Sequence, residues 1–542
     1  MKKTVLIIGM LSAVYVGALI MQKPFPESSK ESILRTAFYS DVPTFHYSSS
    51  NKGSYNCSLY TMPWVFDGLF RKGENDIPMP AIAERFKISS DQKTYTFYLR
   101  DAKWSDGTEV TAYDFEYAWK KLIDPQSKSM TILPELFSPI QNVRKFIRGE
   151  CLFEDVGIAV VDNKTIIIDL EYPAQYFLET LCNPLFFPAP KHIAEQDDGW
   201  SNKPGFVCNG PFYLKKWQKN SEILFRKNPL YWDHEHVYLD GIDVAIVPNA
   251  LTALNLYEKK ELDWMGAPFM KMSYDTSYKT LTEKKEDATV YFFGMNNDKY
   301  PFNNKKLRKA LSYAIDRRAI TENLFHDTAV PVMGALPVSL RLKNTPYFQD
   351  NNVKLAKDLL NEALEEIDKS LDNFPEIELL YNSDAEFLKK MCLAAQDEWR
   401  KNLGLKISLK GMSGASLFID TIQKGDYQMA IISMSAVIFD PLMILQLFEN
   451  KSDVVNRCNW ENKKYKEILQ HSNYSLGEIE RTRLLMEAEE ILMDEMPFIP
   501  ICSMNKSYAK NPKLQGENLS YLQFVDFKSA YFEDARRASS EP

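Results

Sequence analysis

Hydrophobic and polar positions along the chain follow two periods, and the change from one period to the other predicts strands followed by helices. Tyr95–Arg100 alternates aromatic and polar side chains, as a half-buried strand does. The turn Trp104–Thr108 follows, where Gly107 is free to adopt a positive φ. Thr111 then has the side chain and position to cap a helix through Leu122, whose apolar residues recur on one face. We therefore expect a strand, a tight turn and an amphipathic helix in this region.

A second region of strand–helix alternation begins at Val290. The strand Val290–Asn296 is followed by a turn and by a helix that places Leu307, Leu311, Ala314 and Ile315 on one apolar face. Further strands are predicted at Glu376–Tyr381, Leu405–Lys410 and Tyr427–Ser433, and helices at Glu386–Asn402, Ser416–Gln423 and Pro441–Leu447. This succession of crossovers predicts an α/β fold whose lobes have substantially parallel sheets.

The first residues have the pattern of an export signal. Lys2 and Lys3 precede the apolar run Val5–Met21, and residues 22–32 form a polar linker. The run offers no small residues at the usual cleavage spacing and is nearly long enough to span a bilayer. A cleaved signal peptide and an uncleaved anchor in the inner membrane both remain open. The first cysteine is Cys57, so we expect a periplasmic or extracytoplasmic protein that is not a lipoprotein.

The length and the charge of the chain limit the number of domains and the kinds of partner that we expect. The chain has 542 residues with 65 Lys and Arg against 73 Asp and Glu, a formal net charge of -8. At roughly 100–200 residues per domain, this length implies two to four domains. The acidic balance argues against a nucleic-acid partner, because affinity for phosphate comes mainly from clustered Lys and Arg.

No catalytic, metal or cofactor motif is present in the sequence. It contains no His-Glu-x-x-His helix, no Gly-x-Ser-x-Gly elbow and no phosphate-binding Gly-x-x-x-x-Gly-Lys-Ser/Thr loop. His234 and His236 form the one close histidine pair, and we interpret them as solvated, since no third ligand is evident. The seven cysteines lack metal-like spacing and predict either up to three disulfides or buried free thiols. The sequence predicts a protein that is not an enzyme and has no catalytic residue, metal site or cofactor.

A series of short motifs is shared with one known family. In chain order they are Phe66–Leu69, Ala81–Arg85, Tyr95–Thr111, Asp114–Leu122, Cys208–Phe212, Asn228–Trp232 and Ala310–Arg317. With these motifs the chain resembles the extracytoplasmic solute-binding proteins of family 5, which serve peptide-type ABC importers, and most of all the members that bind oligopeptides. The likeness covers nearly everything after residue 33.

The resemblance implies a two-lobed periplasmic-binding-protein fold of type II, in its three-domain peptide-binder variant, with a ligand cleft between the lobes. Domain I would comprise residues 33–68, 194–289 and 505–535, domain II residues 69–193, and domain III residues 290–504. The hinge would lie near Thr289–Phe293 and Cys502–Asn505. The chain would be a monomer that captures oligopeptides by lobe closure and delivers them to an ABC permease with separate ATPase subunits.

The resemblance also implies where a ligand binds. A peptide would be held as an added strand, through main-chain bonds that ignore side-chain identity. Contacts would come from the loop Ser54, Tyr55 and Asn56 on one lobe and from Ser433, Met434, Ser435 and Ala436 on the other. Tyr291 and Phe292 would form walls.

Several charged positions of the oligopeptide binders are replaced here. Val437 stands where an Asp holds the peptide amino group, and Ile422 and Ile431 stand where arginines hold the carboxylate end. Further replacements are Ala415 and Met434 for tryptophans, Gly294 for a glutamate, and Thr289 and Ser435 for two cysteines that cross-link the strand.

Several interpretations remain open after these replacements. One is an oligopeptide binder that fixes the amino group with Asp440 or with an acid from the other lobe. A second is a binder of a less charged ligand, such as a modified or cell-wall peptide. A third is a membrane-anchored surface sensor or adhesin. Ile422, Ile431 and Met434 would equally suit an ordinary core.

Overall fold

The structure is a computed structural model, and it describes residues 31–46, 55–126, 136–270, 281, 283–326 and 328–533. For residues 55–59 only the backbone is described. The predicted export segment and Ser54 lie outside these residues. No helix in the described ranges is long and apolar enough to cross a bilayer.

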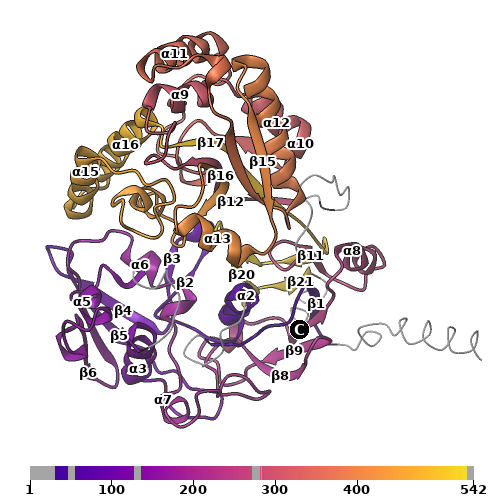
Figure 1. Cartoon of the computed structure of the whole chain (residues 1–542). Helices are drawn as coiled ribbons and strands as arrows, with labels where there is room; N and C mark the ends of the chain where they lie inside the picture. Colours follow the sequence, from indigo (N-terminus) through magenta and orange to yellow (C-terminus); the bar gives the residue numbers. More distant parts are fainter. Residues whose placement is uncertain are drawn as a thin grey trace, which may run out of the picture.

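One mixed sheet has strands in both the upper and the lower part of the molecule as drawn in Figure 1. Its strand order in the described residues is β15-β14-β16-β12-β17-β11-β1-β10-β9-β8, and β13 adds to β17. Two long strands, β12 (Glu283–Met295) and β17 (Phe498–Lys510), pair antiparallel at the centre of this sheet. The register of β12 against β17 shifts between Glu286 and Val290, which marks a bulge.

The remaining strands of this sheet lie on either side of the central pair. On one side are β16 (Met429–Ser435), β14 (Ile377–Asn382) and β15 (Ile407–Met412). On the other are β11 (Trp264–Gly266), β1 (Ile33–Phe38), β10 (Gly241–Ile246), β9 (Glu222–Lys227) and β8 (Phe212–Gln218), while β13 is Ala329–Pro331. In Figure 1 the first group belongs to the upper part of the molecule and the second to the lower part.

The α/β fold class is confirmed, but the expectation of substantially parallel sheets is only partly right. Among the described strands, β1 with β10, β14 with β15, β14 with β16 and β1 with β11 are parallel. The other pairings of the large sheet are antiparallel. The short connection from β8 to β9 leaves no room for the crossover that parallel strands need.

The lower part also contains a separate antiparallel sheet in the order β4-β5-β7-β6. Its strands are β4 (Ala83–Ile88), β5 (Thr94–Leu99), β7 (Thr165–Asp169) and β6 (Ile158–Asp162). Three two-stranded ladders join β2 (Phe70–Lys72) to β3 (Pro78–Pro80), β18 (Leu514–Gln515) to β21 (Tyr531–Phe532), and β19 (Asn518–Leu519) to β20 (Val525–Asp526). The predicted strand at Tyr95 is therefore confirmed as β5.

Helices cover both parts of the molecule. In the lower part they are α2 (Tyr55–Val65), α3 (Ala112–Ile123), α5 (Val143–Ile147), α6 (Phe177–Thr180), α7 (Lys191–Ala194) and α8 (Ala250–Glu258). In the upper part they are α9 (Lys305–Tyr313), α10 (Arg317–Phe325), α11 (Val353–Glu366), α12 (Glu386–Leu403), α13 (Ala415–Gln423), α14 (Leu442–Leu445), α15 (Lys463–Tyr474) and α16 (Glu478–Glu495).

The helix predicted at Thr111 forms for the predicted reason. Thr111 is the N-cap of α3, and its backbone N–H donates to Asp114 Oδ2 at 2.8 Å, completing a capping box. The helix predicted around Leu307 is α9, but it ends at Tyr313, so Ala314 and Ile315 lie just beyond it, fully buried. The apolar pattern predicted correctly which residues are buried, but it did not predict where the helix ends.

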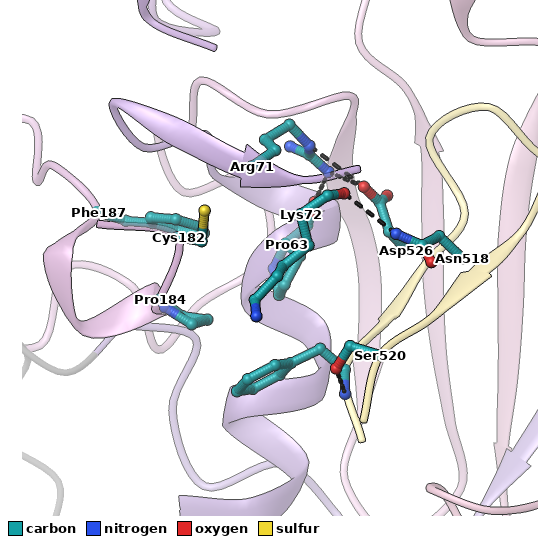
Figure 2. Close-up of a pocket in the computed structure, with 10 residues that line it drawn as sticks. Pro63, Arg71, Lys72, Cys182, Pro184, Phe187, Asn518, Ser520 and Asp526 are labelled. Atoms are coloured by element: carbon teal, nitrogen blue, oxygen red, sulfur yellow. Dashed lines mark hydrogen bonds and ion pairs between the residues drawn. The ribbon is translucent and has the colours of Figure 1, made fainter. Parts of the chain in front are cut away.

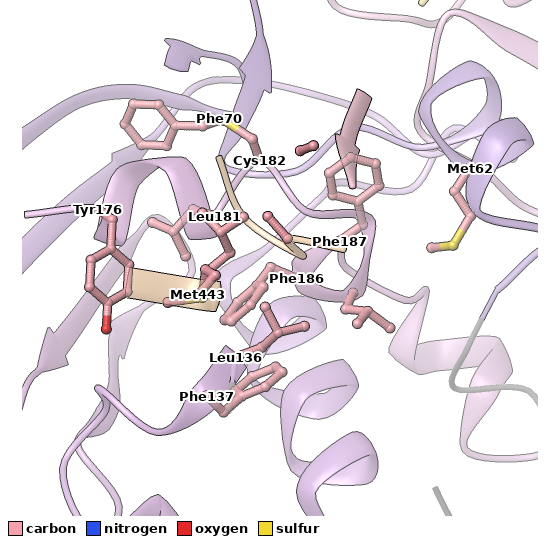
Figure 3. Close-up of a cluster of buried hydrophobic side chains, with 14 of the residues drawn as sticks. Met62, Phe70, Leu136, Phe137, Tyr176, Leu181, Cys182, Phe186, Phe187 and Met443 are labelled. Carbon is pink, nitrogen blue, oxygen red and sulfur yellow. The ribbon is translucent and has the colours of Figure 1, made fainter. Parts of the chain in front are cut away.

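Hydrophobic residues of both parts meet in one continuous core. Figure 3 shows Tyr176, Leu181 and Phe186 of the lower part beside Met443 of the upper part, and all belong to the same buried cluster. A second cluster, around Phe293 and Trp399, fills the upper part. The two parts are therefore in direct contact in this structure.

The six cysteines whose side chains are described carry free thiols, and five of them are buried: Cys182, Cys208, Cys392, Cys458 and Cys502. Burial raises the pKa of Cys208 and Cys502 to about 12, so these thiols stay protonated at neutral pH. The cysteine spacing left disulfides and buried free thiols as alternatives, and these five cysteines are buried free thiols. The histidine pair lies on a short exposed turn, where His236 Nδ1 is 2.5 Å from Asp233.

Candidate functional site

The second half of β16 is paired on one side only. β12 pairs with β16 along its whole length, from Met429 to Ser435. β14 pairs with it only at Met429 and Ala430. Beyond Ala430, no described strand covers the other side of β16, which we call the open edge. An open edge presents main-chain donors and acceptors that can pair with a further strand.

The hydrogen-bond pattern identifies which residues face the open edge. Ala436 N donates to Ala288 O at 2.9 Å, and Asn296 N donates to Gln428 O at 2.9 Å. Hydrogen-bonded pairs alternate along an antiparallel ladder, so the even-numbered residues of β16 face β12. The main-chain groups of Ser433 and Ser435 consequently face the open edge, and those of Val437 continue the same row.

The two ends of the open edge are each held by a side chain. Arg457 Nη1 donates to Ser433 O in a long hydrogen bond of 3.4 Å. At the other end, Asn183 Nδ2 donates to Val437 O at 3.2 Å. Asn183 belongs to the lower part, so this bond joins the two parts of the molecule.

The segment after β16 makes further contacts with the lower part. Phe439 N donates to Glu179 Oε1 at 3.3 Å, and the Phe439 ring stacks on Tyr521 with centroids 4.5 Å apart. Glu179 is also paired with Lys72. Burial raises the pKa of the Glu179 carboxyl, and the Lys72 ammonium acts in the opposite direction. These contacts hold the upper and lower parts together beside the open edge.

Asp440 already has an internal partner. Arg481 Nη1 and Nη2 donate to its two oxygens, both at 2.8 Å. Asp440 Oδ1 also accepts from Leu442 N at the start of α14. The side chains of Asp440 and Arg481 are 9% and 10% exposed, so this is a buried, bidentate ion pair. To hold a peptide amino group, Asp440 would have to share its carboxylate with Arg481.

The predicted pair Thr289 and Ser435 comes together as the resemblance implied. The two residues are directly opposite in the β12–β16 ladder, and their Oγ atoms are 2.8 Å apart. A hydrogen bond therefore joins the two strands at the positions where the resemblance indicates a cross-link in relatives.

The other predicted site residues are distributed between the open edge and the core. Tyr291 is half-buried with its ring 5.7 Å from Phe387, whereas Phe292 is fully buried against Phe498. The buried apolar residues Ile422, Met434 and Ala436 belong to the first core cluster and Ile431 to the second. Ser54 lies outside the described residues. Tyr55 and Asn56 begin α2, and their side chains also lie outside them.

Sequence reasoning did not identify Asn183, Glu179, Arg457 or Arg481. Asn183 and Val437 are 254 positions apart, and Arg457 is 24 positions after Ser433. Neither Asn183 nor Arg457 belongs to a recognisable motif. Arg457 lies four residues from both Asp453 and Glu461 in the sequence, so no local signal indicated that its side chain would bond to Ser433 instead of to an acid.

A small cavity in the lower part has a volume of about 20 Å³ open to the centre of a water molecule. Figure 2 shows Arg71 beside Asp526, and the backbone of Lys72 bonded to Asn518, in its wall. Such a volume holds about one water molecule. The cavity is too small for a peptide, so the open edge is the better candidate site.

Known proteins are similar to this chain in both sequence and fold. The family description "Bacterial extracellular solute-binding proteins, family 5 Middle" matches residues 78–456. The oligopeptide-binding protein OppA of Bacillus subtilis is 34% identical over 483 residues, which cover 86% of this chain and 87% of that protein.

Solved structures agree over almost the whole chain. The periplasmic murein tripeptide binding protein MppA, in an unliganded open form, has a TM-score of 0.76 at 25% identity, covering 94% of this chain and 99% of MppA. A periplasmic oligopeptide-binding protein of Borrelia burgdorferi also has a TM-score of 0.76, at 26% identity, covering 93% of this chain and 100% of that one.

Proposed function

This chain belongs to the bacterial extracellular solute-binding proteins of family 5, and we propose that it captures oligopeptides for an ABC importer. Proteins of this family bind solutes for ABC transporters and are not enzymes. The role of the chain is therefore binding and delivery. OppA of Bacillus subtilis, a similar protein, is named for oligopeptide binding, and this supports the class of ligand.

The open edge of β16 is the observation that carries this proposal. An extended peptide can add to an exposed strand edge through its own main chain. Ser433 and Ser435 offer donors and acceptors at every second residue, the spacing that an added strand requires. Because these bonds use only backbone groups, the edge accepts peptides of varied sequence.

Closure of the two parts around the ligand would complete the site. The contacts of Asn183 and Glu179 with the segment after β16 lie directly beside the open edge. A ligand that touches both parts favours the closed arrangement through its differential contacts. The long strands β12 and β17 run between the parts, and the register shifts between Glu286 and Val290 and between Tyr291 and Phe292 suit the hinge expected near Thr289–Phe293 and Cys502–Asn505.

The domain organisation forms part of the proposal. Domain I would comprise residues 33–68, 194–289 and 505–535, domain II residues 69–193, and domain III residues 290–504. The protein would act outside the cytoplasm as a monomer, with a permease and separate ATPase subunits as partners. Its N-terminal segment would be either removed or kept as a tether.

The decisive experiment measures thermal stability of ligand-stripped protein with degenerate peptide pools. The melting temperature should rise with peptide concentration, as mass action requires for a ligand of the folded state. The Ser435→Pro variant removes an outward N–H, a change that an edge strand tolerates, and should weaken binding roughly tenfold. The control is Lys215→Pro, at the exposed, bulged residue of the remote edge strand β8. An unchanged melting temperature with every pool would refute peptide binding.

A less charged, cell-wall-derived peptide is a second candidate. The acids beside the open edge are already paired, Asp440 with Arg481 and Glu179 with Lys72. Val437 offers no charge to an ammonium group. The structural similarity to a murein tripeptide binding protein supports this candidate. Melting curves with purified murein peptides, compared with the degenerate pools, distinguish the two.

A further inference from the structure

Arg457 differs from the buried arginines of the described residues, because none of those residues gives it an acidic partner. Within the described residues, four arginine residues are less than 10% exposed, and each has a carboxylate within 4.0 Å. The pairs are Arg71 with Asp67 and Asp526, Arg308 with Glu495, Arg317 with Asp350, and Arg481 with Asp440. Internal pairing is therefore the rule for guanidinium groups in this fold.

The half-buried Arg457 makes a single side-chain hydrogen bond to the described residues. This is the 3.4 Å bond from Nη1 to Ser433 O, and it leaves Nε and Nη2 without a protein acceptor there. Burial lowers the pKa of the Arg457 guanidinium, and no described carboxylate lies close enough to form an ion pair with it. A partly desolvated charge without a counter-ion is costly, so an anion at this position would be stabilised.

The main chain around Arg457 is held in place. The Tyr427 hydroxyl donates to Arg457 O, and Asn297 donates to the neighbouring Cys458 O from both its backbone N and its Nδ2, at 2.9 Å each. Cys458 itself is fully buried. The guanidinium is therefore attached to an ordered stretch of main chain. It lies beside the Ser433 carbonyl, which faces the open edge. Such preorganisation lowers the entropic cost of binding a ligand.

We propose that Arg457 binds the carboxylate of a short peptide that adds antiparallel to the open edge, with its C-terminus beside Ser433. The inference rests on the proposed peptide-binding function and names one end of the ligand. A carboxylate accepts from a guanidinium more strongly than the neutral Ser433 carbonyl does, and it matches the planar guanidinium in two parallel bonds.

The same geometry limits the length of the ligand. Ser433 and Val437 mark the two ends of the row, where Arg457 and Asn183 hold their carbonyl groups. Four residues of extended chain span about 13 Å. The ligand strand that pairs between these two side chains therefore has about four residues.

The test compares two degenerate tetrapeptide pools of equal composition, one with free C-terminal carboxylates and one amidated. Melting temperature is measured against concentration for the ligand-stripped full chain. Amidation should weaken apparent affinity roughly tenfold to a hundredfold in the unmodified protein, the worth of a charged hydrogen bond. In Arg457→Gln this preference should disappear, and in Arg457→Lys it should survive in part. Arg483→Gln, at an exposed arginine paired with Glu480, is the matched control that should keep the full preference.

Each outcome separates this inference from the proposed function. Equal binding of the two pools by the unmodified protein would overturn the Arg457 site and leave peptide binding intact. A failure of both pools would refute the peptide-binding function itself. An amidated pool with one Glu per peptide that binds as tightly as the free acids would support the carboxylate site and assign a side chain as its source. The comparison of pools in the unmodified protein holds even if Arg457→Gln fails to fold.

Tighter binding of hexapeptides than of tetrapeptides would contradict the proposed length. Free-acid pools of two to six residues, measured in the same way, give this result directly. The expected optimum is at about four residues, since with the carboxylate held by Arg457 further residues at the amino end would pass the position of Asn183 without pairing to β16.

Discussion

Arg457 and Arg481 both lie near β16, and their surroundings differ in the acceptor that each guanidinium meets. Arg481 donates to both oxygens of Asp440 just after β16, at 2.8 Å each, whereas the one side-chain hydrogen bond of Arg457 to the part of the chain that the structure describes goes to the Ser433 carbonyl at 3.4 Å. Burial lowers the pKa of Arg481, but Asp440 more than offsets this and raises it overall. For Arg457, burial lowers the pKa, and no described carboxylate opposes this effect.

The two arginines show the difference between a charge that stabilises the fold, that of Arg481, and a charge that a ligand can use, that of Arg457. The Arg481–Asp440 pair joins α16 to the start of α14 and is complete within the fold. Removing one partner leaves a buried charge without compensation. Within the described residues Arg457 has no carboxylate partner, so removing its charge breaks no ion pair there, and the guanidinium remains available for an anion.

The largest expected effect is on stability at the complete ion pair. Asp440→Asn should lower the free energy of unfolding by about 3–5 kcal/mol, because the Arg481 guanidinium stays buried without its counter-ion. Chemical denaturation measures this change. Arg457→Met, the matched test at the incomplete site, should change stability by less than about 1 kcal/mol. Similar losses in the two variants would contradict the distinction between the arginines.

A smaller effect is expected at the other end of the open edge. Asn183→Ala removes a hydrogen bond between the two parts and should weaken peptide affinity by about 0.5–1.5 kcal/mol, measured by calorimetric titration. Gln396→Ala removes an amide-to-carbonyl bond of 2.6 Å within the upper part and should leave affinity unchanged. If both variants weakened binding equally, the Asn183 contact would have no special role in closure.

The smallest effect concerns the amino end of the ligand. Since the nearby acids are paired internally, N-acetylated and free peptides should bind about equally well. Val437→Asp should then introduce a preference for free amino termini of up to about 1 kcal/mol, the range of partly exposed ion pairs. Titration with matched peptide pairs checks both statements. A strong loss on acetylation of peptides for the unmodified protein would reveal an amino-terminal clamp elsewhere.

Local patterns were sufficient for the elements and for part of the site. Thr111 with Asp114 predicted the start of α3, and the capping box forms as expected. The resemblance placed Thr289 opposite Ser435, and the two hydroxyl groups are 2.8 Å apart. The end of α9 was less well predicted, because Ala314 and Ile315 continue the apolar pattern after the helical hydrogen bonds stop. Burial and helix length are separate properties.

The sequence by itself determined the family, the α/β class and the replacement of charges at Val437, Ile422 and Ile431, because these depend on local order and residue type. Only the tertiary structure decided which remaining charges are paired. Asp440 meets Arg481 across 41 positions, and Arg457 reaches the open edge of β16 across 24. Charge pairing depends on distances and burial between segments far apart in the chain, and no local pattern records them.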